Sequence, residues 1–142
     1  MTEASIRRLT TYYETISPRI FELTQSFYDR LFRACPEVRP LFQIEIPIQS
    51  QHLAAALALI VRNLRMLDLL EEPLMELGIE HAKVGVRPEH YPIVVQTMIE
   101  ALHAGSGDLW TDELGADWAA VLKRIGQIMM EGAIRAARAS LK

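Results

Sequence analysis

Apolar residues at helical spacing dominate this sequence of 142 residues. In one stretch after another they recur every three or four positions, which places them on one face of an α-helix. The alternation of apolar and polar residues that is typical of a β-strand is nowhere sustained. Prolines and glycines lie between the stretches, where they end one helix and begin the next. This pattern predicts an all-α fold with about six to eight helices of mixed length.

The expected helices can be placed by their apolar faces and by their capping residues. They are residues 6–16, 18–35, 49–64, 73–84, 88–102 and 111–129, with a short helical turn over 36–42. Residues 43–48, which include Pro47, are expected to form a connecting loop, and residues 104–110 a glycine-rich one. Such irregular connections do not suit an up-and-down bundle and favour helices that cross around one core.

Composition fits one domain over residues 1–142 and excludes several classes of function. The net charge is −3 with acids and bases interspersed, so no basic face for nucleic acid or an anionic membrane is indicated. The longest apolar stretch, residues 53–61, is too short to span a bilayer, and the N-terminus lacks a secretory signal pattern. Cys35 is the only cysteine, which favours a cytoplasmic location and is expected to be a buried structural thiol.

His81 is the first candidate for chemistry. It lies one turn after Leu77 near the end of the expected helix 73–84, where an imidazole can project as an axial metal ligand. No cluster of ligands for zinc or a di-iron centre accompanies it. By spacing alone, a single histidine in such a place is more often structural.

Three further residues are candidates that are not specific individually. Tyr28 lies on the apolar side of helix 18–35, Gln49 begins the apolar stripe of helix 49–64, and Phe42 ends the turn 36–42. Each also has an ordinary structural explanation. Tyr28 could be a buried core tyrosine, Gln49 a solvated polar residue near a helix end, and Phe42 a core phenylalanine.

In combination these residues resemble the bacterial globins, that is, the haem domains of flavohaemoglobins and the single-domain haemoglobins of the Vitreoscilla type. The resemblance runs from about residue 6 to residue 134. Residues 27–32 look like the distal-tyrosine helix, and residues 36–42 look like the turn that carries the haem-stacking phenylalanine. Residues 77–91, with Pro88 and Tyr91, are similar to the proximal-histidine segment. The resemblance implies a globin fold around one haem pocket and haem b as the cofactor.

Which residue occupies the distal polar position depends on how the loop before helix 49–64 is aligned with the family. Counting forward from Phe42 without a gap gives His52, whereas counting back from His81 gives Gln49. We prefer Gln49, because a loop accepts a change in length at lower cost than a helix. His52 is then expected on the flank of the helix, exposed to solvent or near a haem propionate.

The resemblance also implies how a gas would be bound. His81 would be the proximal ligand of a five-coordinate iron, and Tyr28 and Gln49 would donate hydrogen bonds to bound O₂, NO or CO. Leu53 would lie one turn after Gln49 in the distal pocket. The other residues expected against the haem are Phe42, His52, Leu57, Leu77, Val86, Tyr91 and Met98.

Two features depart from the flavohaemoglobin pattern. The glutamate that pairs with the proximal histidine in that family falls at Ala133, and Glu131 lies on a different helical face, which argues against peroxidase-like chemistry. The sequence also has no Gly-x-Gly-x-x-Gly motif, so the family's reductase is not expected on this chain.

Four functions remain open at this point. Reversible O₂ binding, for storage or delivery, is favoured. An NO dioxygenase that depends on an external reductase comes next, followed by a gas or redox sensor. A haem-free stress module is last, because it would need neither His81 nor Phe42. We expect a monomer or a weak homodimer, with Met66, Leu67, Leu69 and Leu70 as a candidate interface.

Overall fold

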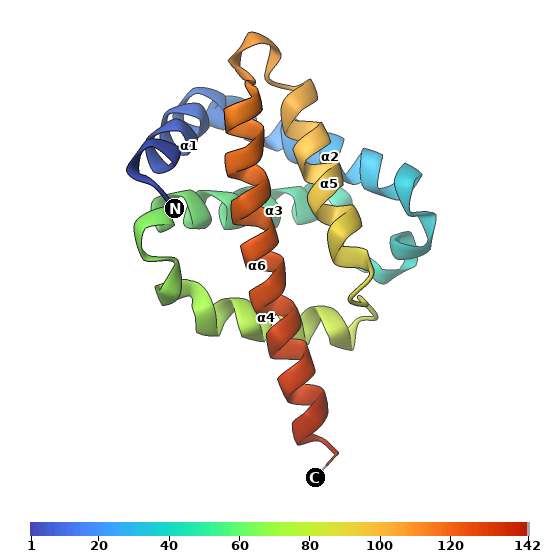
Figure 1. Ribbon diagram of the computed structural model, residues 1–142. Helices are drawn as coiled ribbons and strands as arrows, with labels where there is room; N and C mark the ends of the chain where they lie inside the picture. Colours follow the sequence, from blue (N-terminus) through green and yellow to red (C-terminus); the bar gives the residue numbers. More distant parts are fainter. Residues whose placement is uncertain (142) are drawn as a thin grey trace.

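The computed structural model describes residues 1–141, and that part of the chain consists of helices and connecting turns without β-strands. The α-helices are α1 (Glu3–Ile16), α2 (Ile20–Ala34), α3 (Ile46–Arg62), α4 (Glu71–Lys83), α5 (His90–Ala104) and α6 (Asp112–Ala139). Short 3₁₀ helices are η1 (Ser17–Arg19), η2 (Pro36–Leu41), η3 (Leu64–Leu70) and η4 (Gly107–Leu109). The predicted all-α fold is confirmed. The long α6 crosses in front of α3 and α4 in Figure 1.

Five helices, α1 to α5, start two or three residues away from the predicted positions, and the starts of α3 and α5 bear on the site. α3 begins at Ile46, so residues 46–48 are helical and not part of a loop. Pro47 occupies the first turn, where its missing N–H would have had no partner within the helix. α5 begins at His90 and not at Pro88, because the carbonyls of Arg87 and Pro88 instead close a turn with the N–H groups of His90 and Tyr91.

The start of α6 agrees with the sequence prediction. The Thr111 hydroxyl accepts a hydrogen bond from the Leu114 N–H at 3.1 Å, which satisfies one of the free donors at the helix start. Two acidic residues follow in the first turn, where the helix dipole favours them. The inner face of α6 then carries Trp118 and Val121, each 1% exposed, into the centre of the core.

Two glycines allow α4 and α6 to cross at backbone contact. A Cβ atom at Gly78 of α4 would lie 2.7 Å from the Cα of Met129, and one at Gly132 of α6 would lie 2.6 Å from the Cα of Met75. Real Cβ atoms essentially never approach other atoms so closely. Hydrogen in place of a side chain therefore fixes α4, the helix of His81, directly against the backbone of α6.

The candidate interface of residues 66–70 is only partly open. Met66 and Leu69 are 57% and 64% exposed, whereas Leu70 is buried. No helix in the described part of the chain is long and apolar enough to cross a membrane.

Candidate functional site

The predicted site residues lie mainly on α3 and α4 and on the segments that adjoin them. α3 packs against α1 and α2, and α4 packs against α6 and η3, but the described residues form no extensive contact between α3 and α4. Figure 1 shows α3 above α4, with α6 crossing both. Apolar side chains expected to face a ligand from this region are incompletely covered. Phe42, Leu53 and Val86 are half-buried, and Leu77 is 40% exposed.

His81 is held by a hydrogen bond within its own helix. Its Nδ1 lies 2.8 Å from the carbonyl oxygen of Leu77. Because a carbonyl can only accept, the hydrogen bond requires the proton on Nδ1, and Nε2 keeps its lone pair. The ring is partly exposed, so this lone pair is open to a ligand.

The helix ends two residues after His81, and the chain then turns. The Val86 N–H donates to the His81 carbonyl at 3.0 Å, and Gly85 between them has a φ angle of +106°. Glycine adopts this conformation without the steric cost that a Cβ would add. α4 therefore ends within a turn of its histidine.

Tyr28 is buried at the centre of an aromatic group. Its ring is 4% exposed, meets the Phe42 ring edge to face with centroids 5.4 Å apart, and stacks on Phe32 at 6.0 Å. Burial raises the pKa of the Tyr28 hydroxyl, and the nearby Gln49 side chain partly opposes that rise. The phenol is therefore neutral at physiological pH and can donate a hydrogen bond.

Gln49 and His52 lie differently, although both belong to α3. The Gln49 side chain is half-buried and interacts with Tyr28. The His52 side chain is exposed. The structure therefore brings Gln49, and not His52, together with the buried tyrosine.

The remaining predicted residues surround this region at different depths. Leu57 of α3 and Met98 of α5 are buried in the core, at 2% and 4% exposure. Tyr91 is half-buried, and burial raises the pKa of its hydroxyl. Glu131 is exposed and pairs with Arg135 on its own helix. Within residues 1–141, no carboxylate is hydrogen-bonded to the His81 ring.

Comparison with known proteins identifies the family. The family model named Globin matches residues 25–129, which is most of the chain. The chain is a globin. The predicted fold and the resemblance to bacterial globins are thereby confirmed.

The curated relatives of this globin include flavohemoproteins. It is 33% identical to that of Rhizobium meliloti over 112 residues, which cover 77% of this chain and 28% of the relative. It is also 33% identical to that of Bordetella pertussis over 123 residues, which cover 83% of this chain and 31% of the relative. This globin thus spans less than a third of the length of these relatives.

Solved structures agree with the fold. A bacterial globin from Campylobacter jejuni has a TM-score of 0.86 and 24% identity, and the match covers 96% of this chain and 99% of that one. An engineered carbene transferase from Rhodothermus marinus has a TM-score of 0.90 and 20% identity, with coverage of 100% and 99%. At these identities the likeness establishes the fold alone.

Membership in the globin family implies haem, and the residues of this chain fit that group. The donor set has the required chemistry, because His81 presents a free Nε2 while its Nδ1 is bonded to a carbonyl, the arrangement typical of metal-ligating histidines. The incompletely buried apolar side chains from α3, α4 and the preceding turn provide surface that an apolar macrocycle could cover.

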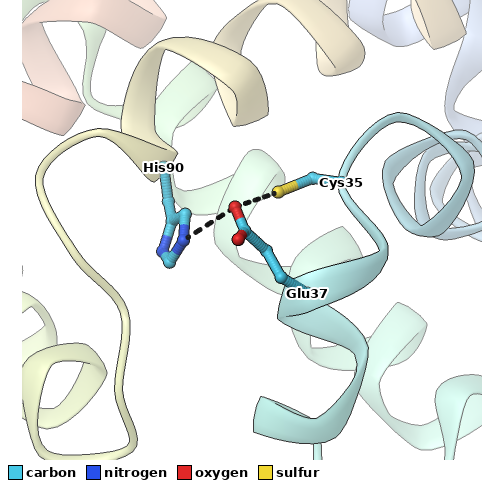
Figure 2. A group of neighbouring side chains, drawn as sticks. All are labelled: Cys35, Glu37 and His90. Atoms are coloured by element: carbon cyan, nitrogen blue, oxygen red, sulfur yellow. Dashed lines mark hydrogen bonds and ion pairs between the residues drawn. The ribbon is translucent and has the colours of Figure 1, made fainter.

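Sequence reasoning missed one cluster of chemically capable side chains. Cys35, Glu37 and His90 lie together, with the thiol and the imidazole both directed at the Glu37 carboxylate (Figure 2). The sequence gives little sign of it, because Cys35 follows α2 and His90 begins α5, and the two are joined only by packing of α2 against α5. Cys35 is buried, as expected, but it is not isolated from other polar groups.

Proposed function

We propose that this globin binds haem b between α3 and α4 and reversibly binds a diatomic gas, O₂ above all. The observation that carries the proposal is the hydrogen bond from His81 Nδ1 to the Leu77 carbonyl, because it leaves the Nε2 lone pair available to hold the iron. Ferrous haem, when bound, would supply an iron atom that can bind a diatomic gas.

On the distal side, Tyr28 and Gln49 supply the polar groups. Both side chains can donate to a gas that carries partial negative charge, and such hydrogen bonds are strong when one partner is charged and water is excluded. Burial keeps the Tyr28 phenol protonated, and its contacts with Phe32 and Phe42 hold the ring in place. We therefore propose tight O₂ binding with slow release.

Apolar side chains then set the affinity for the cofactor. Phe42, Leu53, Leu77 and Val86 would cover the macrocycle, and removal of this surface from water provides most of the binding free energy. His81 would hold the haem iron and so orient the cofactor. His52 is exposed, so we propose that it contacts the haem at most through a propionate group.

A second candidate function is NO dioxygenation with a separate reductase. It is favoured by the relatives named flavohemoproteins and by the pairing of Tyr28 with Gln49, which would serve O₂ activation as well as O₂ storage. Consumption of NO in air, with a supplied flavin reductase and nicotinamide cofactor, tests this activity. A rate no higher than that of the reductase alone would reject it.

Absorption spectroscopy tests haem and gas binding. The protein is reconstituted with haem and recorded in the ferric state, after reduction, and after exposure to air and to CO. We expect a sharp Soret band with stable oxygenated and CO-bound forms, and loss of these in His81→Ala. His103→Ala is the matched control, because His103 is an exposed histidine that stacks on Trp110. Failure to retain haem, or unchanged spectra in His81→Ala, would contradict the proposal.

A further inference from the structure

Three different ligand-type side chains converge at the junction of α2, η2 and α5. The Cys35 Sγ donates to Glu37 Oε1 at 3.2 Å, and His90 Nε2 lies 3.7 Å from the same oxygen. All three ligand atoms lie within 4.8 Å of one another. As Figure 2 shows, Cys35 and Glu37, from the end of α2 and from η2, face His90 at the start of α5.

The combination of donors is selective. A thiolate, an imidazole and a carboxylate are the ligands that Zn²⁺ uses in proteins, usually with tetrahedral geometry, in which neighbouring ligand atoms are close together. Hard cations such as Mg²⁺ would instead require several oxygen ligands. Three protein donors would leave a fourth position for water.

The cluster also combines a fixed part with an accessible part. Cys35 and His90 are buried, with side chains that have little freedom, whereas the Glu37 side chain is 71% exposed. A cation can therefore enter from solvent beside Glu37, and the carboxylate can adjust to it. The neighbouring side chains of Arg87 and Glu89 form an ion pair with each other, with Nε and Oε1 3.0 Å apart, and not with the residues of the cluster.

Protons occupy this junction in the metal-free protein. The Arg87 N–H donates to His90 Nδ1 at 3.0 Å, so the proton of the neutral ring is on Nε2, facing Glu37. The Cys35 Sγ donates to Glu37 Oε1, an oxygen that can only accept when the carboxylate is ionised, so the thiol also carries its hydrogen. A cation would have to replace both of these hydrogens.

We propose that Cys35, Glu37 and His90 form a site for a thiophilic divalent cation, with Zn²⁺ as the preferred ion. Binding forms bonds from the metal to Sγ, a carboxylate oxygen and Nε2. The thiol proton leaves to solvent, and the Nε2 proton is exchanged for one on Nδ1, so one proton is released per Zn²⁺. The Arg87 N–H loses its acceptor in the process. The bound ion would tie η2 to the first turn of α5, independently of haem binding.

Zinc titration of the haem-loaded, CO-bound globin tests the site. Calorimetry in buffers of different ionisation enthalpy should give one Zn²⁺ per chain with release of one proton, and Mg²⁺ should not bind. Zn²⁺ should also protect the only thiol, Cys35, from alkylation, as followed by mass spectrometry. In the amide spectrum, the Arg87 N–H signal should shift.

Variants separate this site from adventitious zinc binding. Glu37→Gln should weaken Zn²⁺ binding by at least about tenfold, because it removes a charged ligand while leaving an exposed side chain of the same size. Glu89→Gln is the matched control, an exposed carboxylate outside the cluster, and should bind as the parent does. Cys35→Ser should abolish tight binding; if it does not fold, Glu37→Gln still decides. No binding by the parent protein, or equal binding by Glu37→Gln, would overturn the proposal.

Discussion

At the scale of single residues, the contrast between His81 and His90 is informative. His81 bonds through Nδ1 to a carbonyl oxygen, whereas His90 Nδ1 accepts from the Arg87 N–H. The partner of one nitrogen thus determines what the other presents, a lone pair on His81 and a proton on His90. Backbone hydrogen bonds thus favour opposite tautomers of the two imidazoles in the metal-free protein.

We expect Tyr28→Phe to release O₂ about 10- to 100-fold faster than the parent, because a hydrogen bond to a charged group contributes about 1.5–3 kcal/mol. Stopped-flow mixing of the oxygenated protein with CO measures this rate. The control is Tyr13→Phe on α1, where only a half-buried hydroxyl outside the aromatic group is lost. An unchanged release rate in Tyr28→Phe would contradict the distal role of Tyr28.

Asp117 should make the free energy of unfolding depend on pH in the acid range. Arg8 donates to both of its carboxylate oxygens, from Nε at 2.7 Å and from Nη2 at 3.2 Å. Burial raises the pKa of Asp117, but the hydrogen bonds and charge of Arg8, together with the nearby Ser5 hydroxyl, outweigh it, so the pKa is lowered overall. The resulting stabilisation is present above the unfolded pKa of about 3.9 and is lost as pH falls through the folded value.

The corresponding measurement is urea unfolding of the parent and of Asp117→Asn as a function of pH. The parent should be the more stable at neutral pH, and the difference should shrink as the pH falls below about 4. Asp108→Asn changes an exposed carboxylate in η4 and serves as the control. A difference between parent and Asp117→Asn that does not vary with pH would show that the Arg8 contact does not set this dependence.

At the scale of elements, the crossing of α4 and α6 governs where His81 lies. Gly78 and Gly132 lie on opposite helices, and each faces the backbone of the other helix. Any side chain there must push the helices apart, because backbone atoms cannot move aside as a flexible side chain can. Displacement of α4 would carry His81 with it.

We expect Gly132→Ala to destabilise the protein by about 1–3 kcal/mol, the usual cost of overpacking, and to weaken retention of haem. Gly126→Ala is the matched control on the same helix. A Cβ there would meet only Tyr91 Cδ1 at 3.4 Å, an ordinary contact, and alanine favours the helix by up to about 1 kcal/mol. Urea unfolding measures both variants. Equal stability of the two would contradict backbone contact at the crossing.

At the scale of the whole molecule, haem should couple the helices that do not pack on each other. α3 and α4 are held by different neighbours in the described structure, so a group bound between them would add contacts that the helices lack. A ligand that binds only the folded state stabilises it in proportion to the logarithm of its concentration relative to Kd.

Thermal unfolding should therefore occur at a clearly higher temperature with haem than without it. At a free haem concentration of 1,000 times Kd, the gain is about 4 kcal/mol. Circular dichroism of the two forms measures the shift, and His81→Ala should show a smaller one. Identical melting temperatures with and without haem would indicate that nothing is bound between α3 and α4.

Sequence and tertiary structure determine different features of this protein. Apolar periodicity predicted all six α-helices, because a helix is stabilised by contacts within a few residues and leaves a local pattern. The start of α3 at Ile46 was missed, since Pro47 resembles a loop residue when its place in the first turn is not known. The candidates His81 and Tyr28 came from family-like motifs, and their roles remain predictions.

The sequence by itself determined the helices, the globin family and the candidate haem residues. Only the tertiary structure decided which distant residues meet, namely the glycines of α4 and α6, Gln49 with Tyr28, and Cys35 with Glu37 and His90. The physical reason is that helix formation depends on neighbours along the chain, whereas such meetings depend on how helices pack. Packing is set by the shape of all contacting side chains together, and no local pattern records it.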